Sequence, residues 1–128
     1  MALTIHTPIQ LRFADFDSFG HANNIAQQSY FDVGKAELFQ ELWRLTGALK
    51  RIPAMIVSVQ NDFFAQIRMG DSIEVVTRID SIGEKSLTIA QCIMCGEREC
   101  SRSRTVMVCF DAESQQSVPV PDEWREYI

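Results

Sequence analysis

The stretch RFADFDSFGHANN, residues 12–24, leads into a long segment that lacks proline and is rich in helix-forming residues. That segment runs from about Ile25 to Gly47, and glycine is a typical residue at the end of a helix. Asp and Asn, both present in the quoted stretch, are favoured at helix starts and in loops. We therefore predict one long helix that follows a polar loop.

The predicted helix has no narrow apolar stripe. Its apolar residues form one broad group at Ile25, Val33, Ala36, Phe39 and Trp43, and others lie elsewhere on the wheel, at Phe31, Leu38, Leu42 and Leu45. A helix that is apolar on most sides is usually buried. We therefore expect the rest of the domain to enclose it.

The remainder of the chain predicts β-strands. A short strand over Pro8–Phe13 precedes the loop, because apolar and polar side chains alternate there. After the helix we predict strands over Ala54–Ile67, Ser72–Ile79, Ser86–Cys95 and Cys100–Phe110, separated by turns. A last short helix follows Pro121, with Asp122 as its cap. Successive hairpins give an antiparallel sheet of about five strands that curls around the helix, an α+β fold.

Length and charge limit the possible functions. With 128 residues, the chain predicts a single domain over residues 1–128, large enough to bury a core. The net charge of -5 argues against a nucleic acid or an anionic membrane as the main partner. Arg98, Arg102 and Arg104 lie on one predicted strand and are expected to form a solvated face. No signal peptide or membrane span is apparent, which favours a cytoplasmic protein.

The four cysteines predict neither a metal site nor a required disulfide. Cys92 and Cys95 have metal-like spacing, but residues three apart on a strand point to opposite faces. Buried, reduced thiols are the usual state in a cytoplasmic protein. Cys95 and Cys100 flank a predicted turn and could form a disulfide only under oxidising conditions.

The quoted stretch is the best candidate for a reaction centre. Phosphate-loop and dinucleotide motifs are missing, and the chain has two histidines, of which His6 is expected in a frayed terminus. The first N–H groups of the predicted helix lack intrahelical partners and carry partial positive charge, so they can hold an oxyanion. Alternation places Asp15 and Asp17 on one side, where a carboxylate could attack an acyl carbon or deprotonate a water. The alternatives are an ordinary helix cap and a divalent metal held by the two acids.

The same residues carry a resemblance to a family. The pattern D-x-D-x-x-G-H-x-N-N before a long helix, formed by Asp15, Asp17, Gly20, His21, Asn23 and Asn24, resembles that of acyl-CoA thioesterases of the 4-hydroxybenzoyl-CoA thioesterase type. The later stretch IVSVQNDFFAQIRMGDSIEV is similar to the second strand and hairpin of that family. The resemblance extends over the whole chain and implies the hot-dog fold. It also implies self-association as edge-to-edge dimers or tetramers, with active sites at subunit interfaces.

The resemblance implies a role for each matching residue. Asp17 corresponds to the catalytic carboxylate, and the backbone at Asn23 and Asn24 to the helix end that polarises the thioester. His21 and Asn23 correspond to supporting polar groups, and Asp15 to a structural one. Residues expected at the substrate are Gly20, Gln27, Lys85 and Ser86, with Ser58, Gln60 and Asn61 approaching from a partner subunit. No metal or cofactor is implied, since coenzyme A is part of the acyl-CoA substrate.

One residue departs from the family pattern. Gln27 stands where many members have an aromatic residue that lines the acyl pocket, which leaves the acyl preference open. The rival functions are a thioesterase acting on acyl-carrier protein, a dehydratase, and a non-catalytic binder of acyl thioesters. The absence of histidine from the predicted helix argues against the dehydratase.

Overall fold

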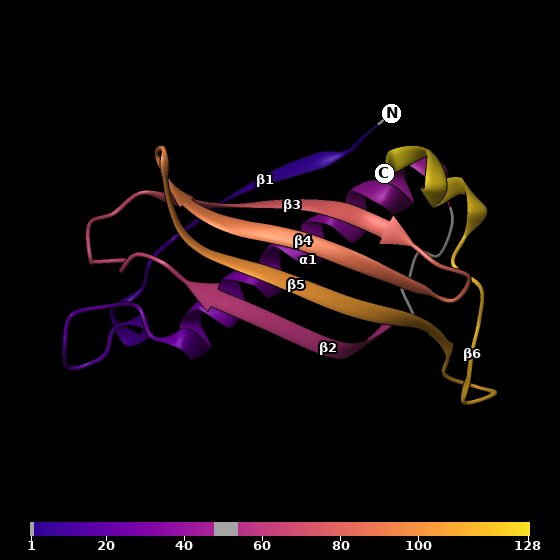
Figure 1. Cartoon of the computed structure of the whole chain (residues 1–128), viewed down its shortest axis with the longest axis horizontal. Helices are drawn as coiled ribbons and strands as arrows, with labels where there is room; N and C mark the ends of the chain where they lie inside the picture. The colour runs from indigo at the N-terminus through magenta and orange to yellow at the C-terminus, as the bar shows by residue number, and fades with distance from the viewer. Residues whose placement is uncertain (1, 48–53) are drawn as a thin grey trace.

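The computed structural model describes residues 2–47 and 54–128. A single long helix lies against one face of an antiparallel sheet (Figure 1). The elements in order are β1 (Thr4–Ile9), η1 (Phe13–Asp15), α1 (Asn24–Thr46), β2 (Ala54–Phe63), β3 (Ile73–Ile82), β4 (Ser86–Cys95), β5 (Arg98–Asp111), β6 (Gln116–Ser117) and η2 (Asp122–Tyr127). The predicted α+β, hot-dog architecture is confirmed.

The sheet has the strand order β1-β3-β4-β5-β2, and every pairing is antiparallel. The two-residue strand β6 adds to β5 outside this path. Consequently β1 and β2, which flank the helix in the sequence, lie at opposite edges of the sheet. The helix crosses the inner face behind the strands (Figure 1).

The core lies between α1 and the inner face of the sheet. Close packing requires Gly34, because a Cβ atom there would lie 2.6 Å from Thr77 Oγ1 and 2.8 Å from Gln91 Nε2. Gln91 Nε2 also donates to the Phe31 carbonyl at 2.8 Å, which ties the helix backbone to β4. The apolar core residues of the C-terminal half of α1 are Leu38, Phe39 and Leu42, packed with Ile79, Leu87, Ile89, Val120 and Trp124.

The first strand lies earlier than the sequence predicts. Strand β1 ends at Ile9, and the chain then turns into η1 instead of extending to Phe13. Pro8 fits in β1 because the strand is at a sheet edge, where a missing N–H is tolerated. The expectation that His6 lies in a frayed terminus is wrong, since His6 pairs with Val76 in the β1–β3 ladder.

The helix is covered on one side only within the described chain. Ile25 is 77% exposed and Val33 47%, so the expectation of full enclosure is wrong for the single chain. The cause is that one curved sheet covers one face of a helix.

At the tail, η2 begins at Asp122, but Pro121 is its N-cap and the Asp122 side chain makes no capping bond. Cys92, Cys95, Cys100 and Cys109 are free thiols.

Candidate active site

Asp15 anchors the loop that precedes α1. Its buried carboxylate accepts hydrogen bonds from the Arg12 backbone N–H (3.0 Å), Arg12 Nη2 (2.9 Å) and the Tyr30 hydroxyl (2.7 Å). Burial raises the pKa of the Asp15 carboxyl, but the hydrogen bonds from Tyr30 and Arg12 lower it by more than burial raises it. The pKa of Asp15 therefore lies below its usual value. The pKa of Tyr30 is raised by burial and by Asp15. These contacts fix the loop to the helix.

Asp17 has the opposite environment from Asp15. Asp15 is the last residue of η1 and is buried, whereas Asp17 lies beyond η1 and is exposed, so the prediction that they share one side is wrong. Asp17 is exposed, and its Oδ1 accepts from the backbone N–H groups of Phe19 (2.9 Å) and His21 (3.3 Å). Gly20 closes this turn by donating its N–H to the Asp17 carbonyl at 3.0 Å, and its φ of 81° favours glycine. Within residues 2–47 and 54–128, no hydrogen bond reaches Asp17 Oδ2.

The helix begins beside this carboxylate with two free backbone donors. Asn23 is the N-cap, and its Oδ1 accepts from the Ala26 N–H at 2.7 Å while its carbonyl accepts from the Gln27 N–H at 3.1 Å. These bonds leave the N–H groups of Asn24 and Ile25 without acceptors among the described residues. Such N–H groups, at the positive end of a 23-residue helix, can hold a developing oxyanion.

A hollow of about 430 Å³ brings these groups together. Residues from the loop and the first turn of α1 form one wall, and the end of β2 with the segment after it forms the other. The lining residues are Asp17, His21, Ala22, Asn23, Asn24, Gln27, Phe63, Phe64, Ala65 and Gln66. The structure therefore places all four predicted catalytic residues, and Gln27, in one cavity.

An adjoining hollow lies further along α1 and shares Asn24 and Phe63 with the first. A chain of side-chain hydrogen bonds crosses it. Asn61 Nδ2 donates to Gln28 Oε1 (2.7 Å), and Gln28 Nε2 donates to Asp32 Oδ1 (3.2 Å). The sequence analysis missed Gln28 and Asp32, although their i, i+4 spacing with an amide and a carboxylate is a helix-surface signal.

Lys35 completes this chain of hydrogen bonds. Its Nζ lies 3.2 Å from Asp32 Oδ1, and the side chain is buried. Burial lowers the pKa of Lys35, and the attraction of Asp32 opposes that change. The ion pair holds Asp32 in place beside the hollow.

Three predicted substrate residues lie away from the loop in the single chain. Ser58 is opposite Val106 and three residues from Asn61, so it points to the outer face of the sheet. Lys85 and Ser86 lie at the β3–β4 turn, at the other end of the sheet (Figure 1). Phe63, at the cavity, pairs with Ser101 of β5, which in turn pairs with Ile93 of β4. At about 3.3 Å per residue, Ile93 lies about 26 Å along the strand from Lys85.

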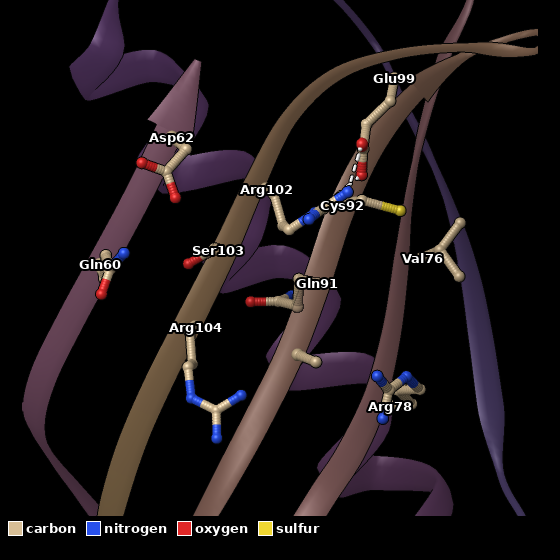
Figure 2. A pocket seen from close by; sticks show the side chains of 11 residues that line it. Gln60, Asp62, Val76, Arg78, Gln91, Cys92, Glu99, Arg102, Ser103 and Arg104 are labelled. Carbon is tan, nitrogen blue, oxygen red and sulfur yellow. Dashed lines mark hydrogen bonds and ion pairs between the residues drawn. The ribbon is translucent and has the colours of Figure 1, made fainter. Parts of the chain in front are cut away.

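The arginines of β5 lie on the outer face, each beside a carboxylate. Figure 2 shows Arg102 and Arg104 around a shallow hollow with Arg78 of β3. Arg102 pairs with Glu99 (2.7 Å), and Asp80 pairs with both Arg78 (2.8 Å) and Arg104 (3.1 Å). Arg98 pairs with Asp71 at 3.1 Å. These pairs neutralise the patch locally.

Within residues 2–47 and 54–128, no group of three or more His, Cys, Asp or Glu residues is placed to hold a metal ion. The two acids of the D-x-D motif face different surroundings, so they do not form a joint ligand pair. None of the helices in the described part of the chain is long and apolar enough to cross a membrane.

The family model described as the thioesterase-like superfamily matches residues 11–128. The chain belongs to this superfamily. The match covers the loop, the helix and every strand except β1, so the resemblance seen in the motif around Asp17 extends through the fold.

Individual relatives agree with this assignment. An uncharacterised protein of Bacillus subtilis, YsmA, is 28% identical over 94% of this chain and 82% of its own. The structure of a predicted thioesterase from Bacillus stearothermophilus is 31% identical, covers 97% of this chain and 92% of its own, and superposes with a TM-score of 0.85. A variant of 4-hydroxybenzoyl-CoA thioesterase complexed with 4-hydroxybenzoyl-CoA shares the fold, with a TM-score of 0.82, 19% identity and coverage of 96% of each chain.

Proposed function

We propose that this member of the thioesterase-like superfamily is an acyl-CoA thioesterase, which hydrolyses an acyl-CoA to a free acid and coenzyme A. The observation that carries the proposal is the shared cavity of Asp17 and the start of α1. Asp17, with one unbonded carboxylate oxygen, lines the same cavity as Asn24, whose backbone N–H has no acceptor among the described residues, and Ile25 lines the adjoining hollow. This pairing of a base or nucleophile with an oxyanion site suits acyl transfer.

Hydrolysis of a thioester needs few further groups from the protein. The N–H groups of Asn24 and Ile25 would bind the thioester oxygen as it gains negative charge. Asp17 would act on the acyl carbon, either directly or through water. His21 and Asn23 hold the loop and the helix cap in place, and Gly20 permits the turn. Coenzyme A arrives as part of the substrate, and the residues at the site supply these roles without a further cofactor.

The adjoining hollow is a suitable place for the acyl group. It begins at Asn24 and runs along α1, so an acyl chain attached to a carbonyl at the helix end would enter it. Its lining combines apolar Ile25 and Phe63 with polar Gln28, Asp32 and Asn61. We therefore favour an acyl group that offers a hydrogen-bond donor, such as a hydroxyl, to Asp32.

Self-association through β2 would complete the site. The edge strand β2 pairs with β5 on one side only, and Met55, Ile56, Val57 and Val59 are 42–56% exposed. An uncovered apolar edge of this length favours pairing with a second copy. Antiparallel pairing of two β2 strands reverses the partner end for end. Lys85 and Ser86 of the partner subunit would then lie at the Asp17 end, where they could contact the phosphates of coenzyme A.

The proposal also covers the choice between free acyl-CoA and acyl-carrier protein, and the cellular location. An acyl-carrier protein would need a basic docking patch, but Arg98, Arg102 and Arg104 are each paired with a carboxylate. We therefore favour free acyl-CoA over the carrier protein, and nucleic acid is not favoured for the same reason. The four free thiols suit the reducing conditions of the cytoplasm, where we place the protein.

Thiol release from acetyl-, hexanoyl-, palmitoyl-, benzoyl- and 4-hydroxybenzoyl-CoA tests the function. The parent protein should hydrolyse at least one of them, and the Asp17→Asn variant should lose about 10²- to 10⁴-fold in kcat because it lacks the carboxylate. Asp62→Asn, a change to an exposed carboxylate on β2 outside the cavity, is the matched control. Light scattering on the same samples measures the expected dimer or tetramer. Equal turnover by Asp17→Asn and the parent would refute the site, and binding of coenzyme A without hydrolysis would indicate a non-catalytic binder.

A further inference from the structure

Gln27 has a buried acceptor atom with no partner in the active-site cavity. The side chain is 5% exposed and lines the same hollow as Asp17. Its Nε2 donates to the Ala22 carbonyl at 3.3 Å, which orients the amide. Its Oε1 is buried and has no hydrogen-bond partner among the described residues.

A buried carbonyl oxygen without a donor costs about 1–3 kcal/mol. Native proteins rarely leave such a group unpaired unless a ligand or an ordered water completes it. Here the unpaired acceptor belongs to Gln27, in the same first turn of α1 as the free donors of Asn24 and Ile25. Asn24 and Gln27, both of which line the cavity, therefore carry a donor and an acceptor that lack partners among the described residues.

The reaction itself supplies a molecule that needs two acceptors. A water that attacks a thioester carbon must direct a lone pair at that carbon, so both of its hydrogens have to be held elsewhere. Asp17 Oδ2 can take one hydrogen, because the two hydrogen bonds from Phe19 and His21 go to Oδ1. Gln27 Oε1 can take the other.

We propose that Gln27 Oε1 and Asp17 together hold the hydrolytic water, and that Asp17 acts as a general base. This inference rests on the proposed thioesterase function and specifies its mechanism. It also accounts for glutamine at a position where the resemblance leads one to expect an aromatic residue, since phenylalanine and tryptophan offer the water no hydrogen-bond acceptor.

In the proposed hydrolysis every bond formed is matched by a bond broken, and the proton returns from Asp17. The water oxygen forms a bond to the acyl carbon while one water proton passes to Asp17, and the carbonyl electrons move to the oxygen held by the N–H groups of Asn24 and Ile25. The carbonyl then re-forms and the carbon–sulfur bond breaks. The proton on Asp17 passes to the departing sulfur. The products are the free acid and coenzyme A, and Asp17 is again a carboxylate.

Two substitutions at Gln27 test the proposal with any acyl-CoA that the parent hydrolyses. Gln27→Met keeps the size of the side chain but removes the acceptor, and kcat should fall about 30- to 300-fold with KM changed less than about threefold. Its melting temperature should change little, because removal of the unpaired buried oxygen offsets loss of the 3.3 Å hydrogen bond to the Ala22 carbonyl. Gln27→Glu keeps an oxygen at the same position and should recover part of the lost kcat. Gln40→Met, the same change at an exposed glutamine of α1 outside both hollows, is the control.

The outcomes separate this inference from the proposed function. A Gln27→Met variant with unchanged kcat, or one that loses stability in proportion to activity, would overturn the role of Gln27. A single turnover in ¹⁸O-water gives an independent result: the label should appear in the released acid, and label in Asp17 would show direct attack and overturn the general-base role. Failure of the parent to hydrolyse any acyl-CoA would instead refute the thioesterase function.

Discussion

The two halves of α1 differ in what surrounds them. At the N-terminal end, Asn24 and Ile25 have free N–H groups and Gln27 has an unpaired oxygen. In the C-terminal half, Leu38 and Leu42 are fully buried among apolar neighbours. Unsatisfied polar atoms cost stability, whereas apolar packing supplies it. The comparison suggests that one half of the helix holds the fold together, which allows the other half to keep groups free for substrate.

The largest effect on stability is expected in the apolar half. Trp124 of η2 is fully buried and its ring lies 5.8 Å from that of Phe39 on α1. Trp124→Ala should lower the free energy of unfolding by about 3–5 kcal/mol, measured by urea denaturation, because it leaves a large cavity. Trp43→Ala, the same change at a site 38% exposed, should lose less than half as much. Equal losses would show that the apolar half does not dominate stability.

A smaller effect is expected from Asp15, which lies near the polar end but is fully bonded. Asp15→Asn should cost about 2–3 kcal/mol, since the amide cannot accept all the bonds from Arg12 and Tyr30. Asp17→Asn, at an exposed site two residues away, should change stability by less than about 0.5 kcal/mol. A large stability loss in both variants would remove the distinction between the two acids.

The same carboxylate predicts a pH dependence. The folded pKa of Asp15 is lowered, so its contribution is full above the unfolded value of about 3.9 and is lost as the pH falls through the folded pKa. Urea denaturation from pH 7 to pH 2 should therefore show a larger loss of stability in the parent than in the Asp15→Asn variant, which keeps the lowered pKa values of Asp80 and Asp111. Parallel curves for the two proteins would contradict this assignment.

The smallest effect is expected at Asp32, between the two halves. Asp32→Asn should lower the free energy of unfolding by about 1–2 kcal/mol, because Asp32 is 55% exposed but the Lys35 ammonium that it pairs with is buried. The ratio of kcat/KM for 4-hydroxybenzoyl-CoA over benzoyl-CoA should fall about three- to tenfold, since the hydroxyl loses a charged acceptor. Glu41→Gln, a change at another carboxylate of α1 outside the hollow, should leave that ratio unchanged.

The sequence by itself determined the local features of the site. The helix runs from Asn24 to Thr46, within a residue of the predicted Ile25 to Gly47, and its cap is Asn23, one of the residue types favoured at helix starts. The turn from Asp17 to His21 is closed by hydrogen bonds between residues of the motif itself. These features depend on hydrogen bonds between near neighbours in the chain, so residue types and spacing suffice to predict them.

Only the tertiary structure decided how those residues are used. Asp15, at the end of η1, is buried and Asp17 is exposed, although alternation had predicted one side for both. The bond between Asn61 and Gln28 joins residues 33 positions apart, and the unpaired oxygen of Gln27 depends on what packs around it. The register of the strands and the close approach of α1 at Gly34 set those contacts. Burial and pairing are properties of distant segments brought together, which no local pattern specifies.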